Sequence, residues 1–217
     1  MTLQQEKLYK VLGANGEATN GGTGKWFLPH GNRPGKWMPK IVGDLVPCEN
    51  GYHLCREKDL VLWLGPTIYG AEYRGDRVDA DDKIVVREAR ILRHFETWNE
   101  KTARLFACDC AEYALGFIKE PDPRSIEAIR VARLFAIGEA TGAELAAAYA
   151  AAYAAARGAY AARGAYAAWA AAWAAACAAT YVAAYVARDT AWAAWAFSAV
   201  TWAWMTERLF QYLDGET

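Results

Sequence analysis

Arginine, tyrosine and tryptophan are the side chains whose types and spacing in this sequence best suit ligand chemistry. They stand in an alanine-rich run over residues 157–189, RGAYAARGAYAAWAAAWAAACAATYVAAYVARD. Aromatic rings can stack on a base, and the arginine fork can hold phosphate or carboxylate oxygens. We therefore predict a ligand site formed by Arg157, Tyr160, Arg163, Tyr166, Trp169, Trp173 and Arg188.

The same residues have two structural explanations. Alanine lets helices approach closely, so the aromatic side chains of one helix can fill the shallow surface of the next and form a core. An arginine near a helix end can simply stabilise the helix dipole in solvent. Few charged residues occur between Gly142 and Met205, so the arginines of this segment are expected to lack nearby carboxylate partners.

The alanine content predicts helix throughout this run, because alanine has the highest helix propensity. At about 100° per residue, one stripe carries residues from Tyr149 to Arg163, and a second, rotated stripe starts at Tyr166. This change of phase predicts a break or bend near Gly158 or Gly164. A second helix boundary is expected at residues 188–190.

Membrane insertion is the other function that an uncharged run of spanning length could indicate. Residues 164–187 carry no charge, but they contain no Leu, Ile or Phe, and their aromatic residues are spread through the middle. Spanning helices concentrate Trp and Tyr at their ends. We therefore expect no membrane insertion.

The composition of the chain narrows the classes of function that remain. The 217 residues carry 24 Lys and Arg against 25 Asp and Glu, a formal net charge of -1. This balance gives no support for binding a nucleic acid polymer. The five cysteines are an odd number, and the start MTLQQEKLYKVL has no basic region followed by an apolar run. We expect a cytoplasmic protein with reduced thiols, in the host cytosol if a phage encodes it.

The first part of the chain has the pattern of a small β-rich domain. Strands are expected at residues 8–12, closed by a turn at Gly16, and at residues 68–73 and 83–92, with a helix at residues 58–64. The Gly- and Pro-rich loop between the first two elements needs anchors, for which Trp26, Phe27 and Trp37 are the candidates.

Helix signals dominate the second part of the chain. Thr97 with Glu100, and Thr141 with Glu144, have the spacing of capping boxes, and Asp122 precedes a proline at the first helical position. The predicted fold class is α+β. A small β-rich N-terminal domain at residues 1–95 is followed by an all-α, alanine-rich helical bundle at residues 96–217.

Catalytic and metal signatures are weak. His53 stands between Cys48 and Cys55, but the spacing C-x4-H-x-C matches no common zinc ligand set. We expect no metal, no cofactor and no catalytic residue. The alternative is an enzyme that resembles ADP-ribosyltransferases, in which Tyr9, His53 and Glu72 or Glu88 flank a nicotinamide cleft.

The run PGKWMPKIVGDLVPCENGYHLCREKDLVLWL, followed by AEYRGDRVDADDKIVVREARIL, resembles a domain of unknown function that is frequent in phage and prophage proteins. Its marks are a Gly-aromatic-His-x-Cys motif, here Gly51 to Cys55, and a later Asp-Lys-Ile strand, here Asp82 to Ile84. The resemblance covers roughly the first 95 residues, and the family has no reaction to carry over.

The second part of the chain is similar to a helical family of immunity proteins of toxin systems. The similarity rests on RLFACDCAEYAL, on PRSIEAIRVARLFAIGE and on the repeats after ELAAA, over about residues 102–213. This chain departs from the family by using Tyr and Trp at many repeat positions. Together the two resemblances imply a protein of phage–bacterium conflict that binds a target without turning it over.

The leading functional prediction is therefore a non-enzymatic binding protein that sequesters a nucleotide-derived immune signalling molecule. The alternative is an immunity-type protein that neutralises a bacterial toxin or defence protein by direct binding. A purely structural or membrane-active phage protein is the third reading. A face of mixed aromatic and arginine residues can also be built between subunits, so we expect a homo-oligomer.

Overall fold

Alternating apolar residues in the first part of the chain and alanine-rich repeats in the second give two different architectures. The computed structural model describes residues 6–19, 21–161, 170, 172–175, 177, 188–191 and 199–217. The chain divides into two units, Met1–Glu96 and Thr97–Thr217. A four-stranded antiparallel sheet is followed by a helical region, so the predicted α+β class is confirmed.

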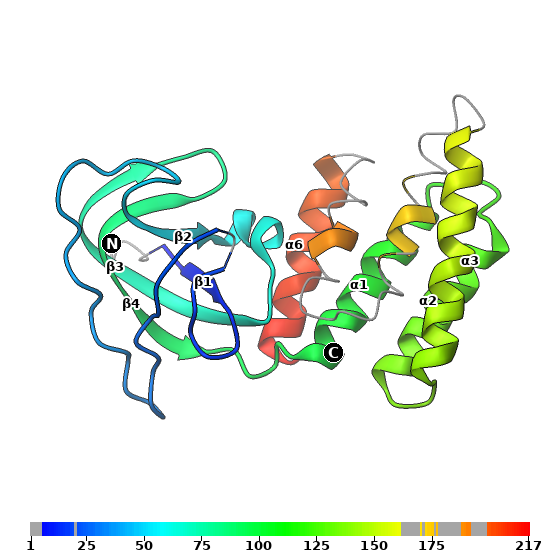
Figure 1. Ribbon diagram of the computed structural model, residues 1–217, viewed down its shortest axis with the longest axis horizontal. Coiled ribbons are helices and arrows are strands. Elements are labelled where there is room, and N and C mark those ends of the chain that lie inside the picture. The colour runs from blue at the N-terminus through cyan, green and yellow to red at the C-terminus, as the bar shows by residue number, and fades with distance from the viewer. Residues whose placement is uncertain are drawn as a thin grey trace. The chain divides into compact units, whose positions relative to one another are not determined.

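Four strands form the sheet of the N-terminal unit: β1 (Leu8–Leu12), β2 (Tyr52–Arg56), β3 (Thr67–Asp79) and β4 (Ile84–His94). Their order is β1-β2-β4-β3, with β1 also paired to β3, so the sheet closes into a barrel (Figure 1). Buried side chains from all four strands fill the interior, among them Leu8, Leu12, Leu54, Ile84 and Ile91. The three predicted strands are confirmed, although β3 extends six residues beyond its predicted end.

The β1–β2 seam is the junction of this barrel with the fewest paired residues. Five residues of β1 pair with β3, from Leu8↔Ala71 to Leu12↔Thr67. Only two pairs, Leu8↔Arg56 and Tyr9↔Cys55, join β1 to β2. The two strands therefore separate after Tyr9, which leaves a gap in the barrel wall between the end of β1 and the start of β2.

The rest of the N-terminal unit consists of a short helix and of loops that aromatic side chains anchor to the barrel. Residues 57–63 form a 3-10 helix, η1 (Glu57–Trp63), where the sequence predicted a helix. Trp26 is buried in the barrel core, and the guanidinium groups of Arg74 and Arg90 lie 4.4 and 4.7 Å from the centre of the Trp37 ring. Trp26 and Trp37 both act as the predicted anchors. Phe27 does not, because 45% of it is exposed.

Helices α1 (Glu100–Leu115), α2 (Pro123–Ala136), α3 (Gly142–Ala161) and α6 (Ala199–Asp214) are the main described elements of the second unit. α1 packs against α2 and α6, and α3 packs against α2 (Figure 1). The Asp122 carboxylate accepts from the Arg124 N–H at 2.9 Å. The Thr141 and Glu144 side chains each accept from the other's backbone N–H. Both predicted caps are confirmed.

The predicted capping box of Thr97 and Glu100 is wrong. The helix begins two residues later than that box requires, with Asn99 as the cap and Thr102 as its partner. Thr97 has another role, because its hydroxyl donates to the carbonyl oxygen of Leu213 at 2.7 Å. A threonine that ties the start of α1 to the end of α6 is not available as a cap.

The alanine-rich region is described only in part. α3 continues through Gly158 to Ala161, so the helix does not break at that glycine. Gly164 lies outside the described residues. Residues 188–191 are helical, and the segments on both sides of them are not described, so the boundary predicted there stays a prediction. None of the helices that the structure describes is long and apolar enough to cross a membrane.

Candidate ligand-binding site

The predicted helical ligand site falls largely on residues that the structure does not describe. Arg163, Tyr166 and Trp169 lie outside the described residues, as does the side chain of Tyr160, whose backbone belongs to α3. Arg157 is exposed on α3. Trp173 is half-buried, with its ring centre 5.6 Å from that of Tyr153 and its side chain against a cluster of alanines. For Trp173, this packing matches the core explanation of the pattern.

Arg188 differs from the sequence expectation that it lacks a carboxylate partner. Its Nε and Nη2 lie 3.2 and 3.1 Å from Oδ1 of Asp189, the next residue in the chain. Because the carboxylate of the neighbouring aspartate pairs with Arg188, the low number of charged residues in this segment is no argument that Arg188 needs an anionic ligand.

A cavity of about 520 Å³ lies close to the predicted helical site. The start of α2, together with Ala155, Gly158 and Ala159 of α3, lines it. Its charged lining residues are Glu120, Asp122 and Arg124, and the last two pair with each other at 2.7 Å. This lining offers little attraction to an anion.

A cavity of about 700 Å³ lies at the β1–β2 seam of the barrel. We call it the seam cavity. Ligand pockets of proteins have volumes of about 300–1,000 Å³, so its size suits a small molecule. It is lined by the separating ends of β1 and β2, by residues 18–19 and 21–27 of the glycine-rich loop, and by Trp63 and Lys83.

Lys10 is the residue of the seam cavity with the most unusual environment. It lies between Leu8 and Leu12 on β1, and the alternation of a strand gives it their inward face. Its Nζ donates to the carbonyl oxygen of His53 at 3.0 Å and lies 4.9 Å from the centre of the Trp26 ring. No carboxylate among the described residues pairs with it. Burial lowers the pKa of the Lys10 ammonium from 10.5 to about 8.

A second cation and a second indole lie on another wall of the seam cavity. The Lys83 Nζ lies 4.5 Å from the centre of the Trp63 ring and 3.1 Å from the Asp82 carboxylate. The Trp63 Nε1 donates to the carbonyl oxygen of Asp82 at 2.9 Å, which fixes the plane of the indole. The cavity thus combines fixed aromatic faces with ammonium groups. This combination suits a ligand that has both a ring and an anionic group.

The Gly-aromatic-His-x-Cys motif also lines the seam cavity. The Tyr52 hydroxyl donates to Pro39, and its ring packs edge-on against Trp26 at 5.3 Å. Burial, and then the charge of Lys10, lower the pKa of His53, so its imidazole is neutral at pH 7. Its Nε2 then accepts from the Cys48 N–H at 2.9 Å. Each of these contacts holds the loop that covers the cavity, so the motif has a structural role here.

Gly51 is required at the start of this motif. Its φ of 138° is rarely adopted by other residues, and an added Cβ would stand 2.2 Å from Cγ1 of Val85. We expect Gly51→Ala to lower the free energy of unfolding by about 2–4 kcal/mol, measured by urea denaturation. Gly43→Ala is the matched control, because Gly43 also has a positive φ but its Cβ would meet nothing closer than 3.8 Å. Its expected cost is about 1 kcal/mol. Equal losses in the two variants would contradict this account of Gly51.

The residues of the alternative enzyme reading do not meet at one site. Tyr9 and Glu72 line a cavity of about 510 Å³ at another part of the barrel, whereas His53 lines the seam cavity. Glu88 lines neither and pairs with Arg74 at 2.6 Å. The described geometry therefore gives no nicotinamide cleft flanked by these side chains. Among the described residues, no three His, Cys, Asp or Glu side chains gather into a metal site either.

Comparisons of the chain with protein-family models, with curated proteins and with solved structures found no match. The two family resemblances drawn from the sequence therefore stay predictions, and the site has to be judged on its own chemistry. Lys10 was missed at the sequence level. The signal for it was present, because LYKVL places a lysine on the apolar face of an otherwise regular strand.

Proposed function

We propose that this chain is a binding protein that sequesters a small nucleotide-like anion in the seam cavity. The observation that carries the proposal is the ammonium of Lys10, a half-buried residue, which lies over the Trp26 ring, donates to a backbone carbonyl oxygen and has no carboxylate partner among the described residues. A buried charge is costly unless it is paired. An anionic ligand in the cavity supplies the missing partner.

The lining supports a ligand with a ring as well as an anionic group. The Trp26 and Trp63 indoles, each with a lysine ammonium near its face, suit a base or another flat ring. Phosphate oxygens of the same ligand can accept from Lys10 and from Lys25, which also lines the cavity. No step in this proposal changes the ligand chemically, so the protein acts as a sponge and not as an enzyme.

The sequence resemblances supply the biological setting of the proposal. In that setting the ligand is a nucleotide-derived immune signal, and the protein acts in the cytoplasm of an infected cell as a counter-defence factor. The predicted site around Arg157 and Arg163 is the alternative place where such a ligand could be held. The predicted homo-oligomer also remains part of the proposal.

Titration calorimetry with adenosine 5′-monophosphate, and with adenosine as the uncharged control, tests the proposal. We expect the monophosphate to bind at least about tenfold more tightly than adenosine, which corresponds to about 1.4 kcal/mol from the charge-assisted contacts. Equal affinities, or no binding of either compound, would contradict an anion site in this cavity.

The affinity should also depend on pH. A bound anion raises the pKa of Lys10 above its value of about 8, so binding takes up a proton when the pH exceeds that value. The phosphate keeps its charge above about pH 7. We therefore expect a constant affinity from about pH 7 to 8 and a loss of up to about tenfold per pH unit above it. The same calorimetric titration at several pH values measures this, and an unchanged affinity up to about pH 10 would exclude Lys10 as the group that binds the anion.

Direct binding of a toxin or defence protein is the second candidate function. It is favoured by large apolar side chains that the helical unit leaves exposed, namely Phe117 at 51%, Ile126 at 51% and Ile137 at 48%. Exposed apolar side chains of this size can anchor a protein interface, and Ile126 and Ile137, near the two ends of α2, would be separate anchors. A pull-down from cells that carry the defence system, compared with a variant that has all three changed to Ser, tests this candidate. Equal recovery of every bound protein by the two would count against it.

A further inference from the structure

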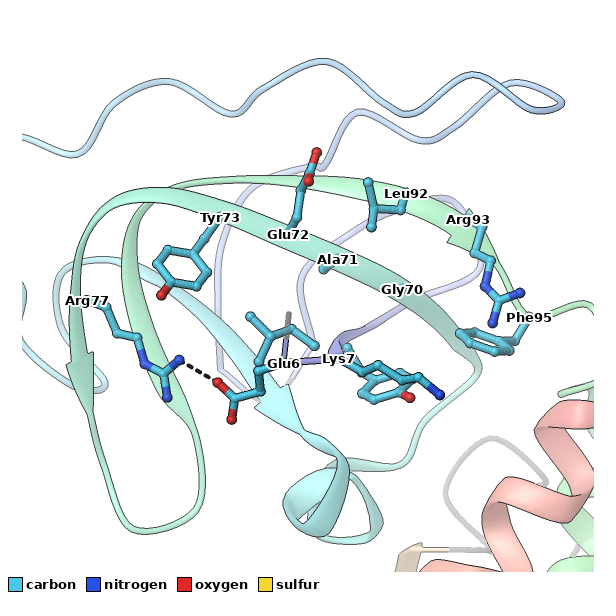
Figure 2. A pocket seen from close by; sticks show the side chains of 12 residues that line it. Glu6, Lys7, Gly70, Ala71, Glu72, Tyr73, Arg77, Leu92, Arg93 and Phe95 are labelled. Carbon is cyan, nitrogen blue, oxygen red and sulfur yellow. Dashed lines mark hydrogen bonds and ion pairs between the residues drawn. The ribbon is translucent and has the colours of Figure 1, made fainter. Parts of the chain in front are cut away.

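A second cavity of the barrel has a lining that the proposed function does not use. It has a volume of about 510 Å³ and lies where β3 continues past the start of β1 (Figure 2). We call it the strand-end cavity. No residue lines both this cavity and the seam cavity.

Two cations of the strand-end cavity have no carboxylate partner in the described part of the chain. The Arg77 guanidinium is neutralised by Asp79 and by Glu6, each at 2.5 Å, and Glu72 forms an ion pair with Arg90. Lys7 and Arg93, in contrast, are exposed, and no described carboxylate pairs with either of them. The described lining therefore has a net positive charge, and Lys7 and Arg93 are its two cations that no described carboxylate neutralises.

Two buried rings border the same space. The ring centres of Tyr9 and Phe95 are 5.9 Å apart, and both side chains are almost fully buried. The Arg93 guanidinium lies 4.4 Å from the centre of the Phe95 ring, and Figure 2 shows these two side chains together at one end of the cavity, with the Arg77–Glu6 pair at the other. An arginine held over a ring in this way is oriented before a ligand arrives.

Gly70 on β3 leaves room beside these side chains. An added Cβ there would lie 3.5 Å from Cγ of Arg93 and 3.9 Å from Cε2 of Phe95, which are ordinary contacts, and the backbone of Gly70 does not have a positive φ. A larger residue at this position would therefore occupy the cavity without straining the strand. The absent side chain at Gly70 contributes to the empty space between Arg93, Phe95 and the sheet.

We propose that the strand-end cavity is a second binding site, for a small aromatic compound that carries one phosphate or carboxylate group. The ring packs against Phe95 and Tyr9, and the anionic group accepts from Lys7 and Arg93. This site is separate from the nucleotide site of the seam cavity, and neither proposal depends on the other.

A titration of the full chain with phenyl phosphate, followed by two-dimensional amide NMR, tests this proposal. Phenol is the uncharged control. We expect phenyl phosphate to shift the amide signals of β1 and β3 around Tyr9 and Gly70. We expect its Kd to rise at least about tenfold in Arg93→Gln, because one of two charge-assisted contacts is lost. Gly70→Val should weaken binding to a similar degree by filling the cavity, while Lys10→Met should leave the Kd unchanged.

Each of the following results would overturn the proposal. One is that phenyl phosphate at millimolar concentration shifts no signals around the strand-end cavity. Another is an unchanged Kd in Arg93→Gln, or phenol binding as tightly as phenyl phosphate. The third is a loss of binding in Lys10→Met, which would place the probe in the seam cavity. If Gly70→Val does not fold, Gly70→Ala is the substitute. Its single methyl group makes only ordinary contacts, and an unchanged Kd in a folded Gly70→Ala would also count against the proposal.

Discussion

Lys10→Met is expected to abolish anion binding in the seam cavity and, at the same time, to stabilise the folded protein. Methionine keeps the length and much of the volume of the lysine stem, so the fill of the barrel is retained. The ammonium that should hold the anion is lost. We expect the Kd for adenosine 5′-monophosphate to rise at least about tenfold, to the level of adenosine, because the charge-assisted contact that is lost contributes at least about 1.4 kcal/mol.

The gain in stability follows from the lowered pKa of Lys10. A change from 10.5 to about 8 corresponds to a penalty of about 3 kcal/mol for the buried charge. This penalty is a net value, because the hydrogen bond to His53 and the contact with Trp26 already contribute to the pKa of the folded protein. The variant should therefore unfold with a free energy up to about 3 kcal/mol higher than the wild type at pH 7.

The pH dependence of this difference gives an internal control. The unfolded chain binds more protons at Lys10 than the folded chain does between pH 8 and 10.5, so the penalty is complete below about pH 8 and disappears as the pH rises to 10.5. The advantage of Lys10→Met should shrink over that interval in urea denaturation curves. Titrating groups that do not interact with Lys10 cancel, because both proteins contain them. Cys55 interacts with the charge of Lys10, so the comparison is made with Cys55 changed to Ser in both proteins. A variant that is less stable than the wild type at pH 7 would contradict the buried charge.

Asp109→Ala is expected to lower the free energy of unfolding of the helical unit by about 3–5 kcal/mol. The Asp109 carboxylate on α1 lies 2.7 Å from Nη1 of Arg133 on α2 and 2.7 Å from Nε of Arg208 on α6. It also accepts from the Tyr212 hydroxyl at 2.8 Å. Only 8% of Asp109 is exposed, and its removal leaves the Arg208 guanidinium without a described carboxylate partner and Arg133 with only the exposed carboxylate of Glu112. Urea denaturation followed by far-ultraviolet circular dichroism measures the loss.

Glu112→Ala is the matched control for Asp109→Ala. Glu112 lies one turn further along α1 and pairs with the same Arg133 at 2.5 Å, but 69% of its side chain is exposed. Exposed ion pairs contribute about 0–1 kcal/mol, so its loss should be small. Similar losses in the two variants would show that burial of the Asp109 carboxylate does not determine the strength of this network.

Local signals in the sequence predicted much of the fold. Two helix starts depend only on residues that are close in the sequence, namely Asp122 before a proline and the reciprocal pair of Thr141 and Glu144. Such local caps can be predicted from the sequence alone. Thr97 has a suitable side chain at a suitable spacing and still does not cap α1. Its hydroxyl is taken by the carbonyl oxygen of Leu213, 116 positions away, and no local pattern contains that contact.

The candidate site was harder to predict for the same reason. Closure of the barrel brings Lys10 to the carbonyl oxygen of His53, 43 positions along the chain, and only this closure creates the seam cavity. Composition drew attention instead to the alanine-rich run, where Arg and aromatic residues are conspicuous. There Trp173 packs against Tyr153, and Arg188 pairs with Asp189. The single lysine of LYKVL does not stand out in the composition. It is nevertheless the stronger signal for a site, because a charge on the apolar face of a strand is costly unless it is paired.

The most direct test of the central claim is mass spectrometry of the ligand that the protein carries out of the cell. The protein is purified from defence-active or infected cells, weighed in its native state, and then heated to release bound small molecules for identification. We predict a released nucleotide-like mass from the wild type and from Arg157→Ala, and none from Lys10→Met. A ligand retained by Lys10→Met but lost in Arg157→Ala would place the site on the helices, and a wild-type protein that carries nothing would contradict sequestration.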